Sequence, residues 1–120
     1  MSEMSKAKFD LEERTAKFGE KIISFCKSVP VNVITTPIVR QLIRSGTSVG
    51  ANYCEANGAS SKKDFKNKIH ICKKEAQETK HWLRMVVTAS PKTKEDAKLL
   101  WKECQELTLI FGKILSSLRN

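Results

Sequence analysis

Five basic side chains recur in one part of the sequence at spacings that suit contact with a polyanion. They are Lys62, Lys66, Lys73, Lys80 and Arg84. On a helix, these five would fall within an arc of about 40°, and the first and last would lie roughly 33 Å apart along the axis. We call this row of cations the basic rail. It predicts contacts with the phosphates of a nucleic acid or with an acidic protein, although a row of charges is also typical of a solvated helix face.

Two arginines in the preceding segment, Arg40 and Arg44, lie four residues apart and would share one side of a helix. They would either extend the basic surface, a role we assign to Arg40, or pair with Glu55 or Glu78 across a subunit boundary. No aromatic side chain alternates with the cations of the basic rail, because Trp82 falls on another side of the same helix. We therefore expect recognition of nucleic-acid backbone and shape rather than stacking on bases.

A second polar group precedes the basic rail. Arg44, Ser48, Asn52 and Glu55 follow one another at steps of four, four and three, which places them on one ridge of a helix. They are not accompanied by a histidine or a metal-ligand cluster, so they do not make a nucleophile with a general base. We interpret the group as a hydrogen-bonded network that fixes helix register or subunit contacts. We expect the protein not to be an enzyme.

The four cysteines are spread along the chain. Cys26, Cys54, Cys72 and Cys104 fall one to each predicted helical segment, with no C-x-x-C pair. This spacing does not match the usual zinc-ligand patterns, and Cys72 and Cys104 fall on apolar seams. We expect free thiols in a reduced compartment, with no metal and no cofactor.

Length and charge describe a small basic protein. The chain has 120 residues, which suits a single domain over residues 1–120. Its 22 Lys and Arg against 13 Asp and Glu give a formal charge of +9, which indicates a polyanionic or acidic partner. Residues 61–90 hold eight basic and three acidic side chains. The N-terminus lacks an apolar segment, and no run of about 18 apolar residues occurs, so we expect a cytoplasmic protein without a membrane anchor.

The apolar residues predict four helices joined by short connections. They recur at alternating steps of three and four, as one buried seam requires, over about residues 11–28, 37–57, 61–89 and 93–118. The helix-start signals are Asp10 with Glu13, Thr36 with Pro37, Ser61 with Asp64, and Thr93 with Asp96. Residues 31–35 predict an extended loop. The pattern indicates an all-α, antiparallel up-down-up-down four-helix bundle.

Two further patterns indicate close packing and assembly. Gly46 and Gly50 lie four apart in the second helix, and each glycine costs on the order of 1 kcal/mol relative to alanine. We expect another backbone to approach there; the alternative is that Gly46 divides the segment into two short helices. In the third helix, Ile71, Trp82 and Met85 form an apolar arc apart from the buried seam. A monomeric bundle does not require such an arc, so we assign these three residues to an oligomer interface.

The second helical segment also carries a recognisable motif. Residues 42–56 read Leu-Ile-Arg-Ser-Gly-Thr-Ser-Val-Gly-Ala-Asn-Tyr-Cys-Glu-Ala, and residues 76–83 read Ala-Gln-Glu-Thr-Lys-His-Trp-Leu. The chain resembles the bacterial four-helix-bundle proteins encoded in intervening sequences of 23S rRNA genes, a family that includes the accessory variability determinant of diversity-generating retroelements. The family pattern, an Arg followed by Ser-Val-x-x-Asn-x-x-Glu, is matched by Arg44, Ser48, Val49, Asn52 and Glu55.

The resemblance implies a four-helix bundle assembled as a ring-like homopentamer. In the retroelement branch it further implies a basic barrel that binds a reverse transcriptase together with nucleic acid; in the ribosomal branch it implies no assigned function. Together with the basic rail, it leads us to expect a non-enzymatic oligomeric scaffold for structured RNA or other nucleic acid, with a reverse transcriptase as candidate partner. The alternative is a structural oligomer, or an adaptor for an acidic protein, that does not bind nucleic acid.

Overall fold

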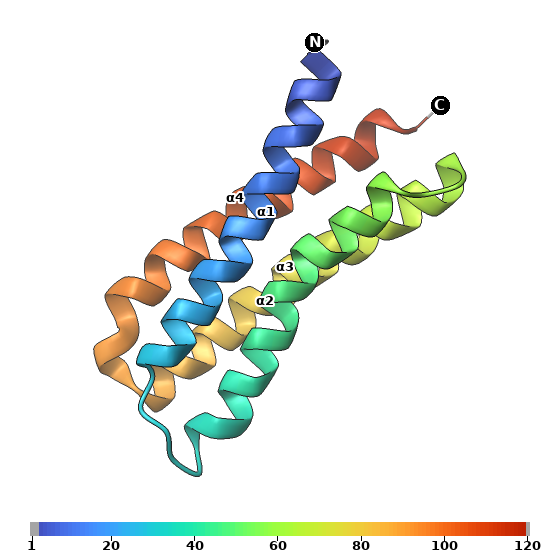
Figure 1. Cartoon of the computed structure of the whole chain (residues 1–120). Coiled ribbons are helices and arrows are strands. Elements are labelled where there is room, and N and C mark those ends of the chain that lie inside the picture. Colours follow the sequence, from blue (N-terminus) through green and yellow to red (C-terminus); the bar gives the residue numbers. More distant parts are fainter. Residues whose placement is uncertain (1–2, 120) are drawn as a thin grey trace.

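Four long helices make up the computed structural model, which describes residues 3–119 and the side chains of residues 10–119. They are α1 (Glu3–Ser28), α2 (Thr35–Asn57), α3 (Lys62–Ala89) and α4 (Lys94–Ser117), with a 3₁₀ turn, η1 (Pro91–Thr93), before α4. The α1–α2 and α3–α4 connections lie at one end and the α2–α3 connection at the other (Figure 1). The predicted all-α, up-down-up-down bundle is confirmed; residues 1, 2 and 120 of the predicted domain lie outside the described residues.

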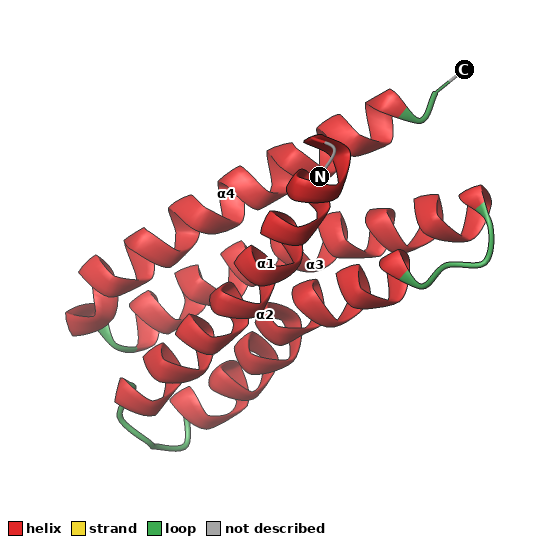
Figure 2. Ribbon diagram, turned by 45° about the horizontal axis from the view of Figure 1, so that its top comes forward, coloured by secondary structure: helices red, strands yellow, loops and turns green. Residues whose placement is uncertain are grey.

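The helices do not contact one another equally. α2 packs against α1 and α3, and α3 packs against α4, whereas α1 and α4, the remaining pair of neighbours, share far fewer close contacts. Where these two meet, Arg14 donates hydrogen bonds to Glu103 at 2.7 and 2.8 Å and to Glu106 at 2.7 Å. Figure 2 shows the helices side by side, joined only by short loops. The helix that carries the basic rail, α3, therefore has α2 on one flank and α4 on the other.

Two helix starts differ from the prediction. α1 begins at Glu3 rather than near residue 11, so Asp10 lies inside the helix and does not cap it. Residues 3–9 are mostly Glu, Met, Lys and Ala, which favour helix and do not stop it from extending upstream. α4 begins at Lys94, and Thr93 does not cap it, because the Thr93 hydroxyl donates to the carbonyl of Ser90 at 2.7 Å.

The start of α3 agrees with the prediction, and that of α2 shifts slightly. The Ser61 hydroxyl accepts a hydrogen bond from the backbone N–H of Asp64 at 3.0 Å, which confirms the cap of α3. Before α2, the side-chain oxygen of Asn32 accepts from the backbone N–H groups of Ile34 and Thr35 at 2.9 Å each. α2 therefore begins two residues earlier than predicted, and the connection is a short structured turn.

One apolar core joins all four helices. Its largest fully buried side chains are Phe18, Ile22, Leu42, Val49, Ile69, Leu83, Val86, Leu107 and Phe111. These fall on the predicted seams, so the three-and-four repeat correctly identifies the inward faces. Within the described part of the chain, no helix combines the length and apolarity needed to cross a lipid bilayer.

α1 and α2 approach each other closely at two glycines. A Cβ atom at Gly46 would lie 2.8 Å from two side-chain carbons of Ile22, and one at Gly50 would lie 3.2 Å from the carbonyl oxygen of Thr15. α2 runs without a break from Thr35 to Asn57. The close approach expected from the glycine spacing is confirmed, and the alternative of two short helices is wrong.

Candidate nucleic-acid interface

The basic rail runs along the side of α3 that faces α4. Its end residues are exposed, whereas Lys73 and Lys80 in the middle are half-buried. The Lys80 ammonium donates to the side-chain oxygen of Gln105 at 2.6 Å and lies 5.2 Å from the ring centroid of Trp101. The Lys73 ammonium lies close to Gly112 of α4, because a Cβ atom added to this glycine would be 3.8 Å from it. The middle of the basic rail therefore lies in the crevice between α3 and α4.

Beyond Lys80, the crevice widens into an open groove of about 390 Å³. Its floor is apolar and is formed by Leu83, Val87, Ala97 and Trp101. Its rim carries the cations Arg84, Lys94, Lys98 and Lys102. The groove lining contains no carboxylate, so its electrostatic potential favours anions. We call the basic rail and the three α4 lysines together the α3–α4 basic face.

Sequence reasoning missed three properties of this surface. The prediction that no aromatic residue accompanies the basic rail is wrong, because Trp101 lies against Lys80. The three α4 lysines were overlooked, although their repeat at every fourth residue in the sequence indicates one helix face. Arg40, predicted to extend the basic rail, is exposed on α2 and so lies on the helix that packs against the other flank of α3.

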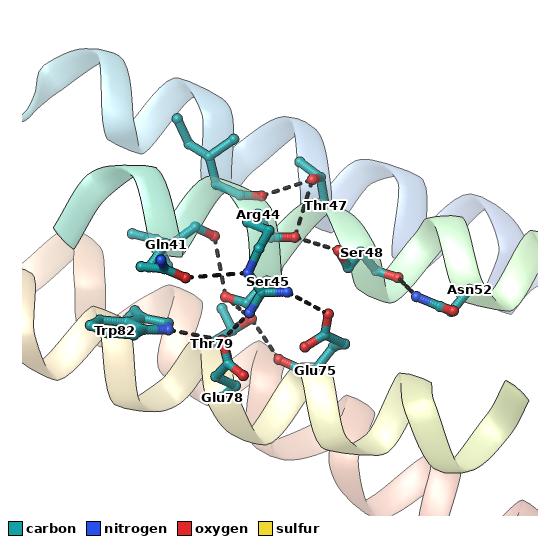
Figure 3. A network of polar contacts seen from close by, with 12 residues as sticks. Gln41, Arg44, Ser45, Thr47, Ser48, Asn52, Glu75, Glu78, Thr79 and Trp82 are labelled. Carbon is teal, nitrogen blue, oxygen red and sulfur yellow. Dashed lines mark hydrogen bonds and ion pairs between the residues drawn. The ribbon is translucent and has the colours of Figure 1, made fainter. Parts of the chain in front are cut away.

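Two carboxylates of α3, Glu75 and Glu78, face α2 (Figure 3). The guanidinium of Arg44 donates to Glu75 at 2.9 Å, to Gln41 at 3.3 Å, and to Glu78. The ring N–H of Trp82 donates to Glu78 at 3.0 Å. This hydrogen bond and the Arg44 cation hold the pKa of Glu78 below its ordinary value. Because both carboxylates are paired on the α2 side, they do not neutralise the α3–α4 basic face.

Smaller polar groups extend this contact into the core. The hydroxyl of Thr79 lies 2.9 Å from the hydroxyl of Ser45 and 2.8 Å from the carbonyl oxygen of Glu75. Both hydroxyl residues are fully buried. Buried polar groups need specific partners, so this cluster favours one register between α2 and α3.

Similarity to known proteins now identifies the family. The family model described as 23S rRNA-intervening sequence protein matches residues 7–113. The chain belongs to this family. A crystal structure of a protein of unknown function from the S23 ribosomal protein family of Bacteroides thetaiotaomicron is 31% identical to it. The match covers 91% of this chain and 97% of that chain, with a TM-score of 0.82. No curated protein matches the chain.

In this 23S rRNA-intervening sequence protein, the motif residues do not form one network. Arg44 and Glu55 reach α3, but at separate places along it. The Ser48 hydroxyl donates to the carbonyl of Arg44, and the Asn52 amide donates to the carbonyl of Ser48 at 2.8 Å. Glu55 pairs separately with Lys68 at 3.7 Å. The predicted four-residue network is corrected, because the short side chains of Ser48 and Asn52 bond back to their own helix.

The three residues assigned to an oligomer interface differ in exposure. Ile71 is 38% exposed, and Met85 is half-buried. Trp82 packs against the core of its own bundle, and its ring N–H already bonds to Glu78. Part of the predicted apolar arc thus has an intramolecular role, and its role in an oligomer stays a prediction.

The thiols of this family member show no reactive arrangement among the described residues. Cys26, Cys72 and Cys104 are buried, and burial raises their pKa values to about 11, about 12 and about 12. These thiols are protonated at neutral pH and weakly nucleophilic. Cys54 is exposed. Within residues 10–119, no three His, Cys, Asp or Glu side chains are grouped to hold a metal ion.

Proposed function

We propose that this protein is a non-enzymatic scaffold that binds structured RNA through the α3–α4 basic face. The observation that carries the proposal is that cations from two helices lie together while two carboxylates of α3, Glu75 and Glu78, are paired with Arg44 on the opposite flank. Such a surface attracts a polyanion over its whole length. The net charge of +9 supports the same class of partner.

The test measures binding of a labelled structured RNA across a salt series. Lys80 is kept, because its ammonium packs against Gln105 and Trp101. The test variant replaces four exposed cations by Gln: Arg84→Gln, Lys94→Gln, Lys98→Gln and Lys102→Gln. If each contacts one phosphate, the slope of log affinity against log salt becomes shallower by roughly three.

A control variant removes the same amount of charge from the two helices that do not form the groove, α1 and α2. It carries Lys17→Gln, Lys21→Gln, Lys27→Gln and Arg40→Gln, all at exposed positions of α1 and α2. We expect the control to keep the native slope, because none of its lost charges lines the α3–α4 groove. The proposal would be contradicted if the two variants gave equal slopes of log affinity against log salt, or if the native chain did not bind RNA.

We further propose that the scaffold is a homopentamer and that its RNA is held together with a reverse transcriptase. The family resemblance supports both statements. Exposed apolar side chains also support assembly, since contiguous groups of them mark contact surfaces; they include Val31, Val33, Ile34, Ile71, Leu99 and Leu109. Light scattering on the native chain tests the subunit number, and a mass equal to one chain would contradict assembly.

A second candidate function is an adaptor for an acidic protein. The apolar floor of the α3–α4 groove supports it, because apolar side chains flanked by carboxylates would match that floor and its cationic rim. Binding of a protein partner by a chain that has no affinity for RNA would favour this candidate.

A further inference from the structure

An exposed aromatic side chain lies on the α3–α4 basic face. Trp101 is 43% exposed, whereas the other tryptophan, Trp82, is partly buried against the apolar core. It forms part of the groove floor with Leu83, Val87 and Ala97. An indole with this much exposed surface that borders an open groove is available to a partner.

The indole is also held in place. The Lys80 ammonium lies 5.2 Å from the Trp101 ring centroid, and the same ammonium donates to Gln105 at 2.6 Å. A cation near an aromatic ring is attracted by its electron cloud, so this contact restrains the indole before any ligand arrives. Leu83 and Val87 follow Lys80 along α3, so the groove extends from the indole toward the end of the bundle.

The cations around the indole match a short strand of nucleic acid. Lys94, Lys98 and Lys102 lie at successive steps of four along α4, and they span about 12 Å. That length equals three to four stacked nucleotides at about 3.4 Å each. Arg84 adds a cation from the α3 side of the groove. Phosphates could therefore contact both walls while a base lies on the floor between them.

We propose that the α3–α4 groove binds unpaired nucleotides, with a base stacked on Trp101 and the flanking phosphates paired with the groove cations. A basic groove combined with an aromatic platform is the arrangement that single-stranded nucleic acids require. The inference rests on the proposed RNA binding and specifies its substrate, since it assigns the groove to single-stranded segments of the RNA. The apolar floor favours this mode, because it offers a surface for base faces rather than hydrogen-bonding groups for sequence readout.

A duplex cannot use this site in the same way. Each base of a duplex has both faces covered by its neighbours, whereas loops, bulges and ends present unstacked bases to aromatic side chains. The phosphates of a duplex can still contact the exposed cations. Loss of the indole should therefore weaken the binding of a single strand and leave the binding of a duplex unchanged. This difference distinguishes affinity that comes from base stacking from affinity that comes from charge.

The experiment compares a short labelled oligouridylate with an RNA duplex of equal length. It uses the native chain, Trp101→Leu, which keeps an apolar side chain, and Trp101→Phe, which keeps an aromatic ring. Base stacking on an aromatic residue accounts for roughly a 5- to 150-fold change in affinity per base. We expect Trp101→Leu to lose about tenfold or more for the oligouridylate only, and Trp101→Phe to recover part of that loss.

A matched control replaces the other tryptophan. Trp82→Phe leaves Trp101 as the single indole, because the chain has two tryptophans, and we expect native affinity together with quenched indole fluorescence when the oligouridylate binds. Circular dichroism checks that each variant keeps its helix content. Unchanged oligouridylate affinity in Trp101→Leu, or no quenching in Trp82→Phe, would overturn the inference.

The remaining outcomes separate this inference from the proposed function. Binding of structured RNA without binding of the oligouridylate overturns the single-strand assignment and leaves RNA binding standing. No affinity for either RNA overturns both. An acidic peptide of alternating leucine and glutamate tests the remaining case. If this peptide binds the native chain but not Trp101→Leu, while the oligouridylate affinity does not change, the groove belongs to a protein partner and the inference is overturned.

Discussion

The guanidinium of Arg44 on α2 donates to the carboxylate of Glu75 on α3 at 2.9 Å, and the Glu75 side chain is only 10% exposed. The arginine side chain is 46% exposed, so the pair lies at the edge of the core. A carboxylate this buried depends on its partner, because water can replace the lost hydrogen bonds only in part. This contact makes the arginine of the family motif a structural residue between two helices.

We expect Arg44→Ala to lower the free energy of unfolding by about 1–3 kcal/mol, because it leaves the Glu75 charge buried without its partner. The double variant Arg44→Met with Glu75→Met removes both charges and should regain part of the loss. Urea unfolding measures the three proteins. The control is Arg40→Ala, an exposed position on the same helix, which should change stability by less than about 0.5 kcal/mol. A double variant no more stable than Arg44→Ala would contradict this account.

Stability should fall in acid through Glu78. The pKa of Glu78 is lower in the folded protein, first because Trp82 donates a hydrogen bond to it and then because Arg44 lies close. A lowered folded-state pKa stabilises the fold fully above the ordinary value of 4.5, and this stabilisation is lost as the pH falls through the folded-state value. We expect Trp82→Phe to make stability less dependent on pH in this acidic range.

The measurement is the urea midpoint of the native chain and of Trp82→Phe from about pH 7 down to about pH 3, the range in which carboxylates titrate. The pKa of Glu103 is also lowered, because Arg14 donates hydrogen bonds to it, but this pair is present in both proteins and cancels in the comparison. If the urea midpoints of the two proteins fall in parallel as the pH is lowered, the Trp82 hydrogen bond does not stabilise the ionised Glu78.

The fold was predictable from the sequence because its main determinants are local. Apolar spacing of three and four marks each buried face, and a hydroxyl such as that of Ser61 can cap a helix within three residues. The early start of α1 was missed because the residues before Asp10 favour helix without carrying a distinct start signal. Local sequence rules therefore predict the presence of each helix well and the residues at which it begins and ends less well.

The candidate site was only half predictable, because it lies between two helices. The basic rail follows from spacing within one helix, but the contact of Lys80 with Trp101 depends on the register between α3 and α4. That register is set by core packing, which no short sequence pattern encodes. For Arg44, the sequence left open an extension of the basic surface or a pair with Glu55 or Glu78 across a subunit boundary, whereas the structure places Glu78 beside it within the same chain. Both differences arise from tertiary packing rather than from helix periodicity.

Thiol reactivity should distinguish one cysteine from the other three. Cys54 is exposed, whereas Cys26, Cys72 and Cys104 are buried with raised pKa values. Because the thiolate is the reactive form, we expect DTNB to modify one thiol of the native protein quickly and the other three only after denaturation. The variant Cys54→Ser should lose the fast phase. Rapid reaction of two or more thiols would contradict the packing of the described core.

Packing between α1 and α2 should make Gly46 intolerant of even one methyl group. An added Cβ would lie 2.8 Å from Ile22, whose fully buried side chain cannot move into solvent. We expect Gly46→Ala to destabilise the protein by about 1–3 kcal/mol, because overpacking outweighs the roughly 1 kcal/mol by which alanine favours a helix over glycine. The control is Gly19→Ala, where the Cβ would meet Thr47 at 3.6 Å, an ordinary contact, so helix propensity should keep or raise stability. Equal urea midpoints for the two variants would mean that the helices can separate at Gly46 without loss, and that the glycine does not determine their spacing.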